Sequence, residues 1–228
     1  MQNKNKFTHI VKYDLAKYNF PKILCDKFEV KGLNALHTHL DNKGTQGGKM
    51  MDLGNDTHSK FHNIFYRNMN SYWPDFHDTW RSFIIEVIKP TFPEEEKIIY
   101  QSFPSFRIQY PNSKAIWVWH YDNDGDHGHP LGEINVMIPL TKMFGTNTVW
   151  KESISGLADY SPLQLSPGEL ALWNGNRCKH GNKINETGVT RVSFDIRVLP
   201  RKFYKPDYSG KTATTGKSYT IGGYYSEI

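Results

Sequence analysis

Cysteine is scarce in this sequence. Only Cys25 and Cys178 occur among 228 residues, and they lie far apart in the chain. Two cysteines make neither a disulfide framework nor a zinc cluster. We therefore expect two free thiols in a reducing compartment rather than a bridge.

Long apolar runs and dense basic clusters are also missing. No apolar stretch approaches the ~18 residues of a membrane span, and the first six residues lack the apolar core of a signal peptide. The formal net charge is +5 and the isoelectric point about 9.0, but the lysines are scattered. We expect a soluble, cytoplasmic protein that binds neither a membrane nor nucleic acid.

Glycine, proline and aromatic residues are plentiful, at 18 Gly, 12 Pro and 14% aromatics. This mixture suits short strands joined by turns. After Ile98 the apolar residues alternate as in strands, with turn residues between the segments. The expected strands are 105–110, 116–121, 133–140, 147–150, 169–173 and 190–199. Six or more short strands indicate an antiparallel sandwich or jelly roll.

The N-terminal part has a different periodicity. Apolar residues recur at helical spacing across 58–89, and Pro74 divides them, so we expect helices over 58–72 and 75–89. Asn-Asp-Thr at 55–57 supplies N-cap candidates for the first helix. We expect one domain with three parts: a helical and loop region over 1–97 that packs on the core, a β core over 98–200, and a C-terminal tail or flap over 201–228.

His120 and Asp122 follow an aromatic run, Trp-Val-Trp. In a strand their side chains would point the same way. They would then supply two ligands of a 2-His-1-carboxylate facial triad, which holds Fe(II) and leaves one face of the metal open. His180 comes 60 residues later, after an Asn-Gly turn, so the chain can cross a jelly roll and return beside the first pair. These three residues are our candidate catalytic metal ligands.

Arg191, Ser193 and Asp195 share a face of the strand expected over 190–199. An Arg fork binds a carboxylate through two hydrogen bonds, and a nearby hydroxyl can donate to the same group. A 2-oxo acid can chelate Fe(II), and its far carboxylate then needs such a site. Arg107 and Asn135 also lie on expected strands. Arg107 is either a cofactor or substrate contact or part of a buried salt bridge, and Asn135 is either a site residue or a buried amide that needs a partner.

The turn after Asp122 offers competing metal ligands, namely Asp124, Asp126, His127 and His129. We prefer Asp122 because it alone shares a strand face with His120. We interpret His127 and His129 as solvated loop residues near the mouth of the site.

Together these residues resemble the iron(II)- and 2-oxoglutarate-dependent dioxygenases with a double-stranded β-helix core. The resemblance includes His120-x-Asp122, His180 and Arg191-x-Ser193. The strings over 132–141 and 146–153 are similar to the streptomycin-biosynthesis oxygenase branch near the phytanoyl-CoA dioxygenase superfamily. The similarity covers roughly 103–200.

The resemblance implies a mainly β fold with N-terminal helices and a jelly-roll, cupin-like core. It implies Fe(II), 2-oxoglutarate and O₂ as cofactors, with iron on His120, Asp122 and His180 and the far carboxylate on Arg191 and Ser193. The implied reaction converts 2-oxoglutarate to succinate and CO₂ while a small polar metabolite is oxidised. Hydroxylation, desaturation and epimerisation stay open, as does the oligomeric state.

Other functional classes also stay open. A jelly-roll protein that binds a metal or sugar without oxygenase turnover would not need Arg191 and Ser193. A cupin-like isomerase or a zinc hydrolase would use the same types of metal ligand.

Overall fold

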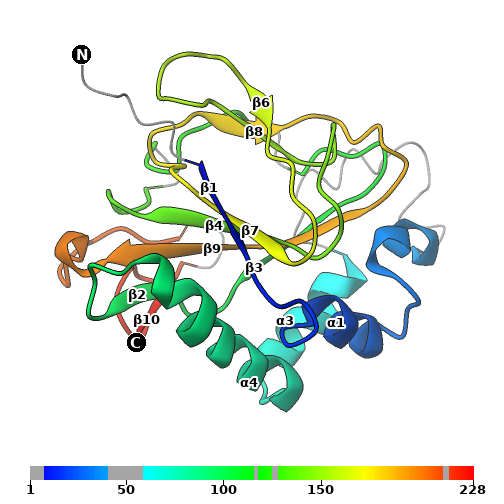
Figure 1. The fold of residues 1–228 in the computed structure, drawn as a ribbon, viewed down its shortest axis with the longest axis horizontal. Coiled ribbons are helices and arrows are strands. Elements are labelled where there is room, and N and C mark those ends of the chain that lie inside the picture. The colour runs from blue at the N-terminus through cyan, green and yellow to red at the C-terminus, as the bar shows by residue number, and fades with distance from the viewer. Residues whose placement is uncertain (1–7, 41–58, 116–117, 125–127, 213–215) are drawn as a thin grey trace.

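The computed structural model describes residues 8–40, 59–115, 118–124, 128–212 and 216–228. A large antiparallel sheet forms the middle layer. Helices α1, α3 and α4 lie against one face, and a smaller sheet lies on the other side (Figure 1). The protein is therefore mainly β, as the sequence predicts. Within the described segments, every helix is too short or too polar to cross a membrane.

The helices are confirmed, with shorter bounds than the periodicity predicts. They are α1 (Phe20–Phe28), η1 (Leu33–His39), α3 (Lys60–Met69), α4 (Pro74–Phe83), a π-helical turn η3 (Ile84–Ile88), η4 (Lys89–Thr91) and η5 (Arg201–Phe203). Ser59 is the N-cap of α3 and forms a capping box with His62, so the expectation of a cap at 55–57, outside the described residues, was wrong. Pro74 begins α4, because the first helical position tolerates a missing N–H.

The strands form two antiparallel sheets. They are β1 (Thr8–Lys12), β2 (Ile98–Gln101), β3 (Ser105–Gln109), β4 (Ile134–Pro139), β5 (Val149–Lys151), β6 (Ser161–Pro162), β7 (Glu169–Trp173), β8 (His180–Asn182), β9 (Arg191–Pro200) and β10 (Tyr225–Glu227). The large sheet has the order β1-β7-β4-β9-β2-β10, with β3 also paired to β9. The small sheet has the order β6-β5-β8. Strands β1 and β10 thus join the large sheet from the two flanking parts of the chain.

The expected strand over 116–121 is not formed in its described part. Residues 116 and 117 lie outside the described residues, and from Val118 onward only His120 pairs, through an isolated antiparallel bridge to His180. Val118 is 65% exposed and Trp119 is half-buried, so the alternation of aromatic and β-branched residues there does not mark a buried strand face.

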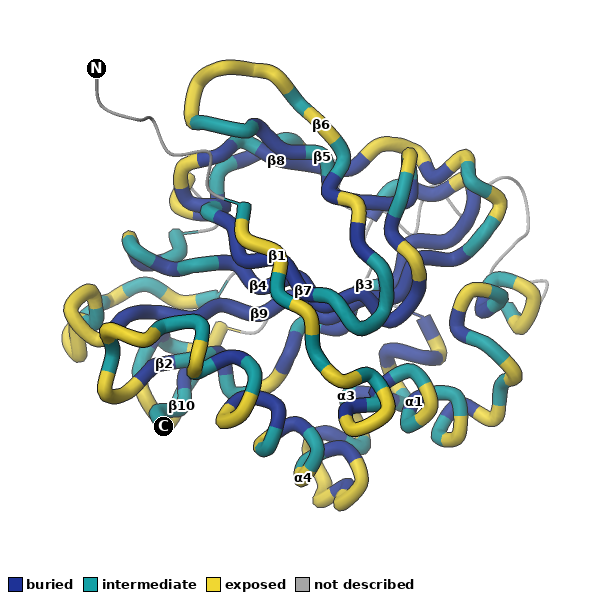
Figure 2. Tube along the Cα trace, in the orientation of Figure 1, coloured by how far each residue is buried: buried dark blue, intermediate teal, exposed yellow. Residues whose placement is uncertain are grey.

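Strand β9 shows how the large sheet is divided between two environments. Val192, Phe194, Ile196 and Val198 belong to the apolar core shared with the helices. Phe194 contacts five aromatic rings, those of Phe20, Phe65, Phe76, Trp80 and Phe106. The alternate residues are polar yet buried: Arg191, Ser193, Asp195 and Arg197. Figure 2 shows β4, β7 and β9 as largely buried between the layers. The polar residues of β9 therefore face the small sheet.

Candidate metal centre

His120 and His180 are brought together by backbone pairing. Each backbone N–H donates to the other residue's carbonyl oxygen at 3.0 Å, which makes a single antiparallel bridge. Directly opposite residues in such a pair place their side chains on the same face. The ring centroids lie 4.4 Å apart. A segment of irregular chain and the first residue of β8 thus present two imidazoles side by side.

Both imidazoles have their Nδ1 atoms tied to nearby backbone. Nδ1 of His120 lies 3.0 Å from the Val118 carbonyl oxygen, and Nδ1 of His180 lies 3.0 Å from that of Cys178. A carbonyl oxygen only accepts, so Nδ1 carries the proton in each ring. In a neutral ring Nε2 then keeps its lone pair, the form in which imidazole binds metal.

Asp122 completes the group. Its Oδ1 lies 3.5 Å from His120 Nε2 and 3.4 Å from His180 Nε2. Two ligand atoms about 2.1 Å from one metal ion, at right angles, are about 3 Å apart. Among the described residues, these form the one group of three or more potential ligands, all buried, with ligand atoms within 4.8 Å of one another. Two imidazoles and one carboxylate match the donor set of Fe(II) oxygenases, although zinc accepts the same ligands.

Asn135 and Arg197 surround the outer oxygen of Asp122. Oδ2 accepts from Asn135 Nδ2 at 2.7 Å and lies 2.9 Å from Arg197 Nη2. Burial raises the pKa of Asp122, but the Arg197 charge and the two imidazoles outweigh it and hold that pKa well below its usual value. Burial lowers the pKa of Arg197, and the carboxylates of Asp122 and Asp195 raise it well above its usual value. Asp122 is therefore ionised, as a metal ligand must be.

Arg191 and Ser193 lie on the same face of β9 as Arg197. The Arg191 guanidinium is buried and donates through Nη1 to Ser193 Oγ at 2.9 Å and through Nε to the Asn147 carbonyl at 3.3 Å. Gln109, opposite Arg191 on β3, also accepts from it at 3.5 Å. The side chains of the expected pair are thus buried and hydrogen-bonded to each other on the polar face of β9.

The other residues considered from the sequence have varied surroundings. Arg107 is half-buried opposite Ser193 on β3. Asn135 fully engages its amide, since Oδ1 accepts from the Gly175 N–H at 2.8 Å while Nδ2 donates to Asp122. His129 was expected to be solvated. Instead its Nδ1 lies 2.7 Å from the buried carboxylate of Glu133, because the C-terminal tail covers this turn.

Of the remaining competitors of Asp122, the structure describes Asp124. Asp124 is exposed and accepts from the backbone N–H of Tyr121. Asp126 and His127 lie outside the described residues.

Sequence reasoning missed Arg197 and Gly175. The alternation that placed Arg191, Ser193 and Asp195 on one face of β9 reaches Arg197 if continued by two residues, so that signal was present. Gly175 was read only as part of a turn. A Cβ there would lie 2.6 Å from both Asn135 amide atoms and from Asp122 Oδ2, a contact that no local pattern reveals.

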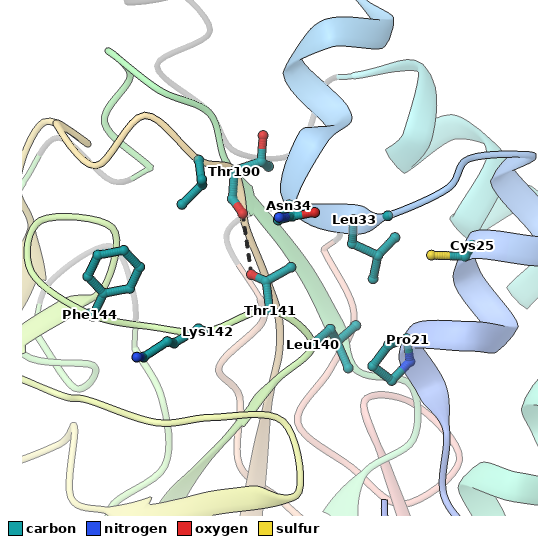
Figure 3. Close-up of a pocket in the computed structure, with 11 residues that line it drawn as sticks. Pro21, Cys25, Leu33, Asn34, Leu140, Thr141, Lys142, Phe144 and Thr190 are labelled. Carbon is teal, nitrogen blue, oxygen red and sulfur yellow. Dashed lines mark hydrogen bonds between the residues drawn. The ribbon is translucent and has the colours of Figure 1, made fainter. Parts of the chain in front are cut away.

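A separate pocket of about 390 Å³ lies between the N-terminal segment and the far ends of β4 and β9 (Figure 3). Pro21, Cys25, Leu33, Leu140 and Thr190 are among the residues that line it. Thr141 Oγ1 donates to the Thr190 carbonyl inside it. None of its lining residues belongs to the His-Asp-His group.

The fold and the site define an antiparallel β protein with a buried two-histidine, one-carboxylate group between its sheets. The chain is similar to the streptomycin biosynthesis protein StrG of Streptomyces griseus, with 31% identity over 173 residues, which is 76% of this chain and 78% of StrG. The chain belongs to the StrG family, which confirms the resemblance to the streptomycin-biosynthesis branch. No family model matches it.

Solved structures are similar at lower identity. A non-heme monooxygenase, the ThoJ–Ni complex, is 16% identical, with 86% of this chain and 75% of that chain covered and a TM-score of 0.43. AviO1 from Streptomyces viridochromogenes Tue57 is 12% identical, with 87% and 92% covered and a TM-score of 0.44. CytC3 with Fe(II) and alpha-ketoglutarate is 17% identical, with 48% of each chain covered and a TM-score of 0.36. These scores are low, so the fold description rests on the strand pairing of this chain.

Proposed function

We propose that this protein is an iron(II)- and 2-oxoglutarate-dependent oxygenase that oxidises a small polar metabolite. The observation that carries the proposal is the convergence of His120 Nε2, His180 Nε2 and Asp122 Oδ1 in a buried site, with both Nδ1 atoms tied to backbone carbonyls. A jelly-roll, double-stranded β-helix core, with the site between the two facing sheets, accounts for this convergence. The flanking parts of the chain complete one domain with it.

In this proposal each residue has a defined task. His120, Asp122 and His180 hold Fe(II), and Arg191 with Ser193 binds the far carboxylate of 2-oxoglutarate. When bound, iron with 2-oxoglutarate and O₂ supplies the oxidising power, and the co-substrate leaves as succinate and CO₂. The protein contributes a dry, buried site: His120, Asp122 and His180 are 7%, 2% and 5% exposed. Exclusion of water strengthens the charge interactions that orient the co-substrate.

The family relationship supports a small polar substrate. StrG is named for streptomycin biosynthesis, and a polar metabolite of that general kind would suit a site lined by buried polar groups. The polar face of β9 and β3, with Arg107 half-buried at its side, provides hydrogen-bond donors for such a molecule.

The test is succinate formation from 2-oxoglutarate, with Fe(II) and O₂, against a panel of amino sugars, cyclitols and amino acids. We expect stimulation by one of these classes, and loss of the stimulated rate in His180→Ala and Asp122→Ala. His9→Ala, an exposed histidine on β1, is the matched control and should retain the rate.

A metal- or sugar-binding protein without turnover is the competing function. Such a protein would bind metal through the same three residues but would not consume 2-oxoglutarate. Its metal or sugar binding would be unchanged when Arg191 is replaced. Metal binding together with that pair of negative results would replace the oxygenase proposal.

A further inference from the structure

The two oxygens of the Asp122 carboxylate have different neighbours. Oδ1 faces the Nε2 atoms of His120 and His180, at 3.5 and 3.4 Å. Oδ2 faces away from them, toward Asn135 Nδ2 at 2.7 Å and Arg197 Nη2 at 2.9 Å. An oxygen that already accepts a hydrogen bond from an amide and forms an ion pair with a guanidinium has little lone-pair capacity left for a metal.

Asn135 cannot turn away from this position without losing a second bond. Its Oδ1 accepts from the backbone N–H of Gly175 at 2.8 Å, which fixes which amide atom faces Asp122. The backbone of Asp122 is tied to the same residue, through its N–H to the Gly175 carbonyl at 3.0 Å. Only glycine leaves room for this arrangement, since a Cβ at 175 would lie 2.6 Å from Asn135 and Asp122 atoms.

Arg197 is held just as firmly. Its Nη1 lies 2.5 Å from Asp195 Oδ1, while Nη2 reaches Asp122. Arg197 and Asp195 are two residues apart on β9, and Arg197 is directly opposite Asn135 on β4. Both groups beside Oδ2, the amide and the guanidinium, therefore come from facing positions of two paired strands. Their placement is a property of the sheet and not of a loop.

We propose that Asn135 and Arg197 are positioning residues that keep Oδ2 off the metal, so that Asp122 binds through Oδ1 alone. This inference rests on the proposed function, because it concerns the same metal site. A carboxylate bound through both oxygens would fill one more coordination position. With a six-coordinate metal, two imidazoles and a one-oxygen Asp122 leave three positions, the number that a chelating 2-oxo acid and O₂ require together.

The number of open positions is measurable without turnover. Mn(II) added to the metal-free, full-length protein takes water at every open position, and water-proton relaxation at saturating protein counts the exchanging waters. We expect three waters in the wild type. Asn135→Ala removes the amide that donates to Oδ2, and Arg197→Lys replaces the two-nitrogen bridge between Asp122 and Asp195 by a single nitrogen. Both variants keep the net charge and weaken the hold on Oδ2, and we expect two waters, a fall of about one third in the inner-sphere relaxation.

Asn185→Ala is the matched control. Asn185 is also a buried asparagine that donates to two carbonyls, those of Gln109 and Val189, and it touches none of the three candidate ligands. It should keep three waters. Far-UV circular dichroism checks that each variant is folded. If Asn135→Ala does not fold, the number of waters counted in Arg197→Lys tests the proposal.

The outcomes separate the inference from the function on which it rests. Wild-type relaxation in folded Asn135→Ala and Arg197→Lys would overturn the positioning role and leave the metal site intact. A wild-type protein that binds neither Mn(II) nor Fe(II) would overturn both.

Discussion

Replacing Arg191 by glutamine removes the cation that we propose binds the far carboxylate of 2-oxoglutarate. The Arg191 side chain is 2% exposed, and it donates to Ser193 Oγ and the Asn147 carbonyl. Loss of one partner from a buried, hydrogen-bonded charge pair costs about 2–5 kcal/mol. The dissociation constant for 2-oxoglutarate should therefore rise about 30- to 5,000-fold. Ser193→Ala loses one neutral donor and should raise it only about 2- to 10-fold.

The assay is calorimetric titration of 2-oxoglutarate into the Fe(II)-loaded protein without oxygen. Pyruvate, a 2-oxo acid without a far carboxylate, is the internal comparison, because Arg191→Gln should leave its weaker binding unchanged. Arg177→Gln, an exposed arginine, is the matched control. A folded Arg191→Gln variant with wild-type affinity for 2-oxoglutarate would refute the reasoning. So would a variant whose affinity for pyruvate falls by the same factor as its affinity for 2-oxoglutarate.

Three further predictions concern stability. Phe194→Ala should lower the free energy of unfolding, measured by urea titration, by about 3–5 kcal/mol, because it leaves a cavity where a ring was fully buried among five others. A loss under about 1 kcal/mol would contradict the packing described. Glu152→Ala leaves three backbone N–H groups without their acceptor, one of them next to His180. Amide hydrogen exchange over residues 153–160 should therefore become faster. Unchanged exchange rates would show that the Glu152 carboxylate does not hold this loop. Burial raises the pKa of Tyr13 and Tyr110 to about 12, so the folded state disfavours their ionisation, and stability should fall as pH rises from about 10 to about 12. Urea titrations across that range should show a smaller fall for Tyr13→Phe, and an identical profile would argue against the burial effect.

Helical periodicity predicted α3 and α4 because their apolar residues pack into one core that they share with α1 and the large sheet. The alternation in β9 predicted the shared face of Arg191, Ser193 and Asp195 for the same reason. Such patterns indicate which side of a helix or strand is buried, so the prediction holds even when the ends of the element differ by a few residues.

The surroundings of Asp122 were beyond such patterns. Asn135, Gly175 and Arg197 come from three separate segments, and their contact depends on how those segments meet. The strand expected around His120 was wrong for a related reason: the segment pairs through one bridge to His180, which depends on how two distant segments meet. The C-terminal tail gave no periodic signal, yet it supplies β10 and covers His129, because its tyrosines pack as a cluster.

One titration tests the central claim most directly. Fe(II) and then 2-oxoglutarate are added without oxygen to the wild type and to His180→Ala, and the visible absorption spectrum is recorded. We predict a weak metal-to-ligand charge-transfer band in the wild type, because a 2-oxo acid that chelates iron through its keto oxygen produces one, and no band in His180→Ala. A wild-type protein that binds Fe(II) and 2-oxoglutarate but shows no such band would contradict the proposal that the three residues form an oxygenase iron site.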